Sequence, residues 1–420
     1  MEVEKQSIWE VLRDRRMLIC VGLGLASGLP LYLLLQLVPF WLRLEGVSLT
    51  VIGLVSLAQV PYTLKFLWSP LLERYQVTTL GRRRGWMLLT QGGLILCIAA
   101  LGLLRPTSDI YLLFALTLAI GVFSATQDIV IDAFRREILE TDGELALGNT
   151  IHVQAYRVSG FIPGSLGFIL AGQYSSELNF AVMAAFMSLG LILTLLLREP
   201  QTGVAPPTNL RTAVTLPFVE FFQRRGIGAA LLMLAFMALY KLGDNMATAL
   251  ASPFYVDLKF DPVVIGVVVK NAAFWPAIVG AFLGSMVIFR IGINRALWVF
   301  GFLQWITIFG FVWLAAAATP EIWMLSIVIG AEYLGVGMGT AAYVAFIARE
   351  TSRVAVATQL ALFTALASTP RLVTGAVSGI IVDSMGWVDF FWLSAGLAIP
   401  GMLLLIWVAP WNGQQAPSVS

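Results

Sequence analysis

The sequence predicts an all-α integral membrane protein with twelve transmembrane helices in two six-helix halves and with both termini in the cytoplasm. The first reason is composition, because 59% of the 420 residues are apolar and only 12% are charged. A soluble domain carries about 25% charged residues, so this chain cannot cover a water-facing surface. A soluble enzyme, a disordered chain and a coiled coil are therefore excluded. The net charge of +2 offers no basic field for nucleic acid.

Apolar windows that could cross a bilayer follow one another along the whole chain. A spanning helix needs roughly 20 mainly apolar residues. Such windows lie at 17–42, 50–72, 86–104, 110–134, 150–173, 179–197, 227–251, 262–289, 296–317, 322–347, 356–382 and 389–409. The first window is too long for the apolar core of a cleaved signal peptide, which has about 7–15 residues. We therefore expect a multi-pass membrane protein.

Lysine and arginine residues gather in alternate connections between these windows. The connections on the side of the N-terminus hold most of them, including Arg13, Arg15, Arg16, Arg82, Arg83, Arg84, Arg135, Arg136, Arg224, Arg225, Arg290, Arg295, Arg349 and Arg353. The opposite connections hold Arg43, Arg105 and Lys259. Because cytoplasmic loops carry the excess of Lys and Arg, both termini are predicted to be cytoplasmic.

The second half of the chain repeats features of the first at a nearly constant offset. The matched pairs are Val51-Ile52-Gly53 with Val264-Ile265-Gly266, Pro39-Phe40 with Pro253-Phe254, Gly121-Val122 with Gly335-Val336, Arg135 with Arg349, and Arg157 with Arg371. Such self-similarity indicates a duplicated six-helix unit. The predicted organisation is a first half at 1–197, a cytoplasmic linker at 198–226, a second half at 227–411 and a disordered tail at 412–420.

Ionisable residues inside the predicted spans are the candidates for function. A charge at the bilayer centre costs at least ~2.5–3.5 kcal/mol, so each such residue needs a reason. They are Lys65, Asp128, Asp132, Arg157, Lys241, Asp244, Lys270, Glu332 and Arg371. We expect them to face a central cavity rather than lipid. The slight excess of positive charge suits a substrate that carries carboxylates.

Two acids are the candidates for proton coupling. Glu332 stands about halfway along its span with no opposite charge within four residues, and a carboxyl in such a low-dielectric setting can take up a proton near neutral pH. Asp128 is the second candidate, because it lies deep in its span and has no positive neighbour on its own helix. The alternatives for Glu332 are a permanently neutral acid or an acid held by an arginine of another helix.

A set of polar residues is predicted to bind substrate. The set comprises Lys65, Arg157, Lys241, Asp244, Lys270, Asn271, Arg371 and Gln127. The planar fork of arginine suits a carboxylate, although the partner of Arg157 and Arg371 could also be an internal acid. Lys241 and Asp244 are three residues apart on one helix face, so the alternative for them is that they only neutralise each other.

A second set is predicted to form ion pairs or a gate at the cytoplasmic side. This set comprises Asp132, Glu73, Arg74, Arg82, Arg83 and Arg84. Asp132 lies close to Arg135 and Arg136, and the arginine run joins two spans. The alternative for the run is a signal of topology alone. His152 is expected to be structural or solvated, and Cys20 and Cys97 give neither a disulfide framework nor metal-ligand spacing.

Several enzyme and energy-coupling motifs are absent from the sequence. It contains no GxxxxGK[ST] phosphate loop, no HExxH metal site and no GxSxG nucleophile elbow. We therefore expect no enzyme activity, no cofactor and no drive by ATP.

Runs in both halves resemble the AmpG family of muropeptide permeases, whose architecture is that of a major facilitator transporter. They are Ala26–Leu31, Lys65–Pro70, Gly81–Trp86, Gln127–Val130, Leu239–Asp244, Gly337–Thr340 and Ala357–Gln359. The resemblance implies import of N-acetylglucosamine–anhydro-N-acetylmuramyl peptides for cell-wall recycling, driven by the proton-motive force, by a monomer in the bilayer of a Gram-negative inner membrane. Two alternatives stay open. One is import of another large anionic cargo, such as a ferric siderophore. The other is a non-transport assembly factor, which would not need paired internal charges.

Overall fold

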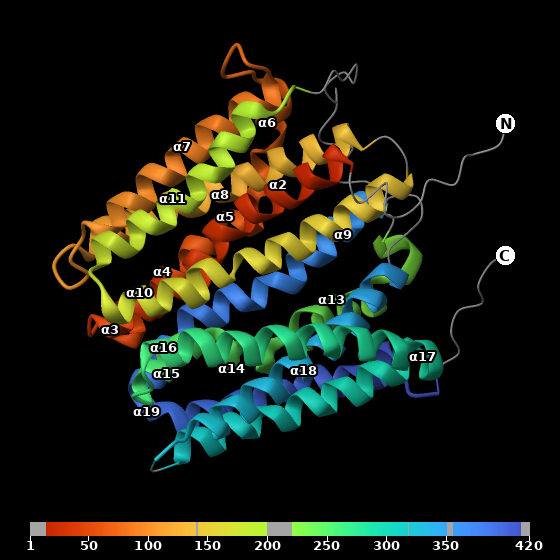
Figure 1. Cartoon of the computed structure of the whole chain (residues 1–420). Helices are drawn as coiled ribbons and strands as arrows, with labels where there is room; N and C mark the ends of the chain where they lie inside the picture. Colours follow the sequence, from red (N-terminus) through yellow and green to blue (C-terminus); the bar gives the residue numbers. More distant parts are fainter. Residues whose placement is uncertain (1–13, 140–141, 200–220, 318, 351–355, 413–420) are drawn as a thin grey trace. The chain divides into compact units, whose positions relative to one another are not determined.

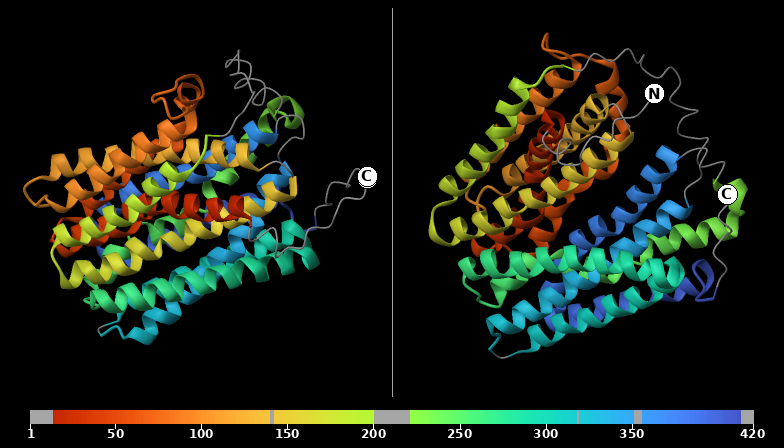
Figure 2. Two further views of the ribbon diagram at one scale, coloured as in Figure 1. Left: turned by 45° about the horizontal axis from the view of Figure 1, so that its top comes forward. Right: turned by 45° about the vertical axis from the view of Figure 1, so that its right-hand side comes forward.

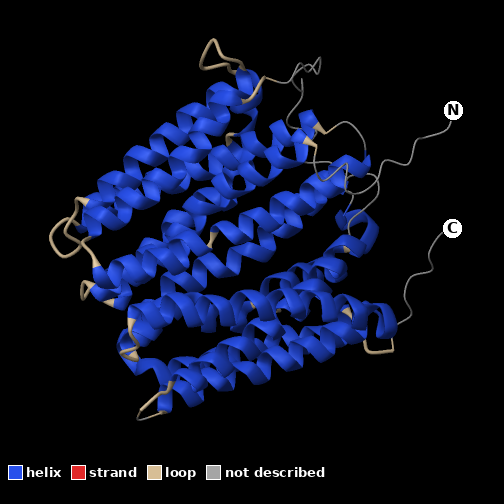
Figure 3. Ribbon diagram, in the orientation of Figure 1, coloured by secondary structure: helices blue, strands red, loops and turns tan. Residues whose placement is uncertain are grey.

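The structure is a computed structural model that describes residues 14–139, 142–199, 221–317, 319–350 and 356–412. All regular structure in these ranges is helical (Figure 3). The chain divides into two compact units. Unit 1 comprises Met1–Val47, Val55–Pro206 and Asp261–Gly266, and unit 2 comprises Ser48–Leu54, Pro207–Phe260 and Val267–Ser420. The predicted linker falls largely on 200–220, outside the described residues, and the predicted tail falls largely on 413–420, also outside them.

Unit 1 is built from helices of the first half of the sequence (Figure 1). Its elements are α2 (Arg15–Tyr32), η1 (Leu33–Leu37), α3 (Val38–Leu44), η2 (Ser56–Gln59), α5 (Val60–Leu64), η3 (Lys65–Leu67), α6 (Ser69–Arg74), α7 (Arg82–Gly102), α8 (Ile110–Ile138), α9 (Asp142–Ser159), η4 (Ile162–Leu166), α10 (Gly167–Gln173) and α11 (Ser176–Leu196). The side chain of Asp14 caps α2 and that of Ser175 caps α11, since each accepts a bond from a backbone N–H of the first turn.

Small residues set the packing inside unit 1. Helix α2 lies along α9, and α7 lies along α11 (Figure 2). A Cβ atom added at Gly24 or Gly28 of α2 would collide with the backbone of α9. Because glycine lets two helix backbones approach closely, these positions hold α2 against α9.

Unit 2 is built from helices of the second half of the sequence. Its elements are α13 (Ile227–Leu239), α14 (Leu242–Ala249), α15 (Ala251–Asp257), α17 (Lys270–Ala316), α18 (Ile322–Glu350) and α19 (Val356–Val408). Gly292 with φ 81° divides α17, and Gly386 with φ 80° divides α19. An aromatic core that includes Phe236, Phe300 and Phe346 packs α13, α17 and α18 together.

Two short segments belong to the unit opposite to their half of the sequence. The start of α4 (Leu49–Val55) lies in unit 2, where Asp383 accepts hydrogen bonds from the backbone N–H and the hydroxyl of Thr50, both at 2.7 Å. The segment Asp261–Gly266, which carries α16 (Pro262–Val264) and the start of η5 (Ile265–Val269), lies in unit 1. These segments contain the repeated Val-Ile-Gly triplets. The structural units therefore differ from the predicted halves at the repeat itself.

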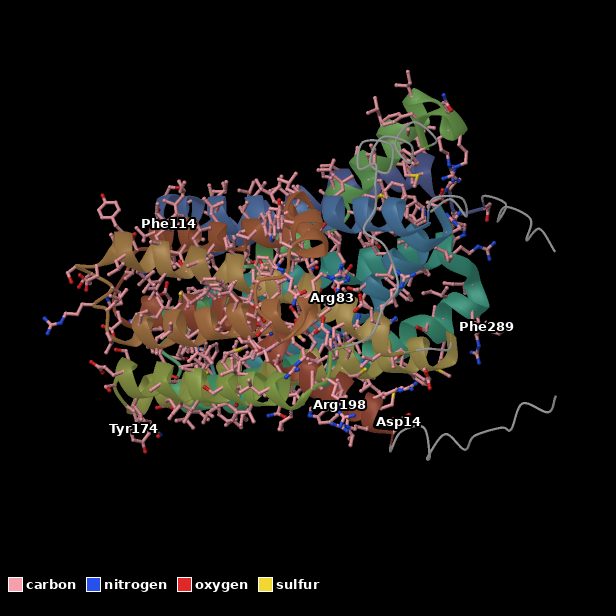
Figure 4. All side chains as sticks on the ribbon, turned by 90° about the horizontal axis from the view of Figure 1, so that it is seen from above. Asp14, Arg83, Phe114, Tyr174, Arg198 and Phe289 are labelled. Atoms are coloured by element: carbon pink, nitrogen blue, oxygen red, sulfur yellow. The ribbon has the colours of Figure 1, made fainter. Side chains whose placement is uncertain are left out.

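The described residues contain eight helical runs that are long and apolar enough to cross a membrane. They are Arg15–Leu44, Arg82–Gly102, Ile110–Ile138, Ser176–Leu196, Ile227–Asp257, Pro262–Ala316, Ile322–Ile347 and Thr369–Val408. The protein is therefore an all-helical, multi-pass membrane protein, while twelve spans and cytoplasmic termini stay predictions. Figure 4 shows Arg83 and Arg198 toward one end of the unit 1 helices, and Phe114 and Tyr174 toward the other.

Candidate functional site

Unit 1 contains a charged cluster centred on Asp128 of α8. Its Oδ2 atom lies 2.8 Å from the Nζ atom of Lys65, which begins η3. Its Oδ1 atom accepts a hydrogen bond from the hydroxyl of Ser27 on α2. One carboxylate thus joins three elements of unit 1. Asp128 and Lys65, predicted as a proton site and a substrate ligand, are in fact partners of each other.

Polar side chains next to Asp128 bond to neighbouring helices. The hydroxyl of Tyr62 donates to that of Ser124, and the indole N–H of Trp68 donates to the Thr126 hydroxyl at 3.0 Å. Gln127 is fully buried, and its amide donates to the carbonyl of Ala26 on α2 at 3.2 Å. The observed contact of Gln127 holds α8 against α2, and its predicted contact with substrate stays a prediction.

Unit 2 contains a second charged cluster, around Asp244 of α14. The Nζ atom of Lys241 lies 3.2 Å from Asp244 Oδ2, and the two residues are only 7% and 9% exposed. The direct pairing of these two residues is therefore confirmed. The second carboxylate oxygen of Asp244 is buried without a hydrogen bond among the described residues.

Glu332 of α18 is the most deeply buried acid of this cluster. Its exposed fraction is 0%, and the carboxyl of Asp244 and the hydroxyl of Thr307 lie beside it. Neither of its oxygens has a hydrogen bond of good geometry to a described residue. An alternative was that an arginine of another helix holds Glu332, and no such ion pair is found within the described ranges. The charge of Arg371, on α19, acts on Asp244 instead.

A small pocket opens beside Asp244. Its lining residues come from the turn before α14 and from α14, α17 and α19, and are Tyr240, Asp244, Gly301, Gln304, Trp305, Ile308, Ala398 and Met402. The wall combines aromatic surface with one carboxylate and one amide. Its volume of about 10 Å³ is that of one water molecule, so it is a gap between helices rather than a cargo site.

The other predicted substrate residues have different surroundings. Lys270 is buried at the start of α17. The amide of Asn271 donates to the carbonyl of Val267 at 2.8 Å and accepts from the indole of Trp275 at 3.3 Å. Arg157 on α9 and Arg371 on α19 have exposed side chains. Contact of these residues with substrate, and the central cavity, stay predictions.

The arginine run at the start of α7 forms one ion pair of the predicted kind, through Arg83. The guanidinium of Arg83 donates to Glu137 Oε1 of α8, at 2.7 and 3.0 Å. The carboxylate of Glu199 accepts from the backbone N–H groups of Arg83 and Arg84, at 2.7 and 2.9 Å. A carboxylate at a helix N-terminus is favoured by the helix dipole. The run therefore holds α7, α8 and the end of α11 together, in addition to any effect on topology.

Of the other residues predicted for the gate, one is seen in an ion pair. Asp132 accepts a bond from Arg135 at 3.0 Å, which confirms the predicted pairing on α8. Glu73 and Arg74 lie in α6, but their side chains are outside the described ones. Arg82 begins α7.

A matching cluster stands at the end of α18 in unit 2. Arg225 pairs with the carboxylate of Glu350, and Arg349 donates to that carboxylate at 3.1 Å and to Asn294 at 2.8 Å. Burial, and then the charge of Arg225, lowers the pKa of Arg349 from its ordinary value. Arg349 is the repeat partner of Arg135, and both are ion-paired.

Sequence reasoning missed the residues that complete these clusters. Ser27, Glu137, Glu199 and Thr307 are far in sequence from the groups they contact, and no spacing signal marks them. His152 is buried against α2, as expected for a structural role. Within the described ranges no group of three His, Cys, Asp or Glu side chains could hold a metal ion, and both cysteines are free.

The chain was compared with known protein families, and the family that it matches agrees with its helical fold and with the buried charges of each unit. The family model of the Major Facilitator Superfamily matches residues 20–345. The chain belongs to this superfamily and is a membrane transporter, not an enzyme. Such a protein moves a small-molecule substrate across a membrane.

Proteins with similar sequences indicate which family of transporters the chain resembles. An uncharacterized protein of Haemophilus influenzae is 48% identical over 94% of this chain and 95% of its own length. The anhydromuropeptide permease of Escherichia coli K12 is 37% identical, over 94% of this chain and 80% of its own. The Escherichia coli permease, together with a protein of Rickettsia felis named putative transporter AmpG 4 that is 29% identical, confirms the resemblance to the AmpG family. The crystal structure of a D-xylose–proton symporter shares the fold, with a TM-score of 0.72, 11% identity and coverage of 95% and 99%.

Proposed function

We propose that this chain imports N-acetylglucosamine–anhydro-N-acetylmuramyl peptides across the inner membrane of a Gram-negative bacterium in symport with protons. The observation that carries the proposal is the 37% identity to the Escherichia coli anhydromuropeptide permease over 94% of this chain. A cargo with carboxylates on its peptide also fits the cations of the predicted spans, namely Lys65 and Arg157 in unit 1 and Lys241, Lys270 and Arg371 in unit 2.

The proton gradient is the proposed driving force, and no cofactor takes part. Glu332 is the first candidate for the proton site, because it is completely buried and neither of its oxygens is hydrogen-bonded to a described residue. Asp128 is the second candidate, and its ion pair with Lys65 would be broken by protonation. We further propose a monomer with twelve spans and cytoplasmic termini, in which Gly292 and Gly386 each separate two spans.

Transport into proteoliposomes tests the proposal. Purified protein is reconstituted, an inward proton gradient is imposed, and uptake of labelled anhydro-disaccharide tripeptide is measured with and without a protonophore. Accumulation above the external concentration that the protonophore abolishes is the expected result. Uptake of a ferric siderophore instead of the muropeptide would contradict the proposed cargo. Accumulation of the muropeptide without a proton gradient would contradict the proposed coupling.

A further inference from the structure

We propose that Glu332, Asp244 and Lys241 form a proton-controlled switch that presents the Lys241 ammonium to a substrate carboxylate only when Glu332 carries a proton. This switch rests on the proposed proton symport, and its three residues would link the proton to the cargo. Asp244 is a positioning residue, because it lies between the proton site and the cation.

The arrangement of the three residues is the first step. Asp244 uses one carboxylate oxygen to hold Lys241, at 3.2 Å, and its other oxygen is buried without a hydrogen bond to a described residue. Glu332 lies beside Asp244 and is completely buried. The two carboxyls are therefore neighbours in a buried site, and Asp244 also holds one cation.

The charges are the second step. Ionising two neighbouring carboxyls that are removed from water is unfavourable, so the pair favours a state with one proton. With the proton on Glu332, its O–H can donate to the free oxygen of Asp244, and the cluster of two carboxyls and one ammonium is neutral. Without the proton, both carboxylates attract Lys241, and its ammonium is held more strongly.

The surroundings offer few other sources of charge. The titratable or polar groups of unit 2 that act on this pair come from several helices. They are Lys241, Arg371, Thr307, Tyr240 and Tyr255. Arg371 acts on Asp244 through its charge, but its own side chain is exposed, whereas Lys241 is only 7% exposed. Lys241 is therefore the cation on which the proton has the largest effect.

The consequence for the cargo follows from linkage. If the proton loosens the hold of Asp244 on Lys241, it raises the affinity of Lys241 for a carboxylate, and the bound carboxylate raises the affinity for the proton by the same factor. A ligand without a carboxylate gains nothing from the switch, so the proton should favour peptide-bearing over peptide-free saccharide.

Two measurements on purified, full-length protein test the switch. The first is cargo-free infrared titration of the carbonyl stretch of a protonated carboxyl. We expect the wild type to show one such signal, Glu332→Gln to lack it, and Asp244→Asn and Lys241→Gln to move its midpoint in opposite directions. The control is Glu321→Gln, which removes an exposed acid of unit 2 that only accepts a bond from Trp323. A signal that is unaffected by Asp244→Asn would overturn the switch.

The second measurement is the affinity for anhydro-disaccharide tripeptide and for the peptide-free disaccharide between mildly acidic and mildly basic pH. The wild type should bind the tripeptide more tightly as pH falls, by at most about tenfold per pH unit for one linked proton. Glu332→Gln should bind it tightly at every pH, and Lys241→Gln should bind it more weakly than the wild type with little dependence on pH. A wild-type pH profile retained in Glu332→Gln overturns the switch but leaves the cargo in place. A wild type that binds neither ligand overturns the proposed cargo, and the infrared titration then decides the switch alone.

Discussion

Lys65 Nζ lies 2.8 Å from Asp128 Oδ2, although the two residues are 63 positions apart in the sequence. The pair joins η3 to the middle of α8, and the hydroxyl of Ser27 adds a bond from α2. The side chains of Lys65 and Asp128 are 31% and 18% exposed, so water screens the pair only in part. A cation inside unit 1 is thus already occupied by an acid of the same unit.

Removal of one member of this pair should destabilise unit 1. Lys65→Gln leaves the Asp128 carboxylate uncompensated, which costs about 3–5 kcal/mol for a fully buried pair and on the order of 2 kcal/mol at this partial exposure. Thermal unfolding of the purified protein in detergent measures the loss. The double variant Lys65→Gln with Asp128→Asn should recover part of it, because no uncompensated charge remains. Equal stability of Lys65→Gln and wild type would show that the ion pair contributes nothing.

Glu332→Gln should uncouple transport from the proton gradient. The amide keeps the shape of the side chain and mimics the protonated acid, but it cannot release a proton. Accumulation of substrate against a gradient should therefore be lost, while exchange of labelled for unlabelled substrate across the membrane survives. If the variant still concentrates substrate, Glu332 is not the coupling site.

Pairs that lie close in the sequence could be predicted, and pairs between helices could not. Lys241 with Asp244 and Asp132 with Arg135 follow from the helical repeat, since residues three apart share a face. The partners Lys65–Asp128 and Arg83–Glu137 depend on which helices are neighbours, and one sequence does not contain that information. The surroundings of a buried group could not be predicted either. The charge of Glu332 marked it as a candidate site, but the sequence does not show that its oxygens lack hydrogen bonds.

The ends of a helix were predicted correctly where the apolar stretch and the helix end at the same residues. The window 110–134 corresponds to α8, which extends to Ile138 because its last turn is polar but still helical. The window 86–104 misses the first turn of α7, since that turn consists of arginines that Glu199 and Glu137 satisfy. The window 50–72 is not one regular helix, because turns of 3₁₀ helix precede the prolines at 61 and 70.

The buried ion pair of Arg83 should stabilise the packing of α7 on α8. Glu137→Gln removes the charge opposite a guanidinium that is only 4% exposed, which should cost about 3 kcal/mol. The yield of monodisperse protein and its unfolding temperature should both fall. Arg136→Gln serves as a control, because this side chain is exposed and its loss should change stability by less than about 0.5 kcal/mol. Similar behaviour of both variants would argue against a structural role for the pair.

Cargo selection gives the last prediction, since it depends on which cations reach substrate. The candidates are Lys65, Arg157, Lys241, Lys270 and Arg371. A cation that bonds a substrate carboxylate makes a charge-assisted hydrogen bond, roughly twice as strong as a neutral one, and its removal should cost on the order of 2–5 kcal/mol in binding. A cation that only holds helices together, as the pairing of Lys65 with Asp128 indicates, would instead lower the amount of folded protein.

We therefore expect at least two of these residues, when changed to Gln, to weaken binding of peptide-bearing substrate far more than binding of the peptide-free disaccharide, at normal expression. Arg157 and Arg371 should be among them, because they are repeat partners with exposed side chains and a guanidinium that suits a carboxylate. Binding of both ligands to each purified variant provides the measurement. Equal losses for the two ligands in every variant would mean that the cations act on packing or gating, and that other groups select the cargo.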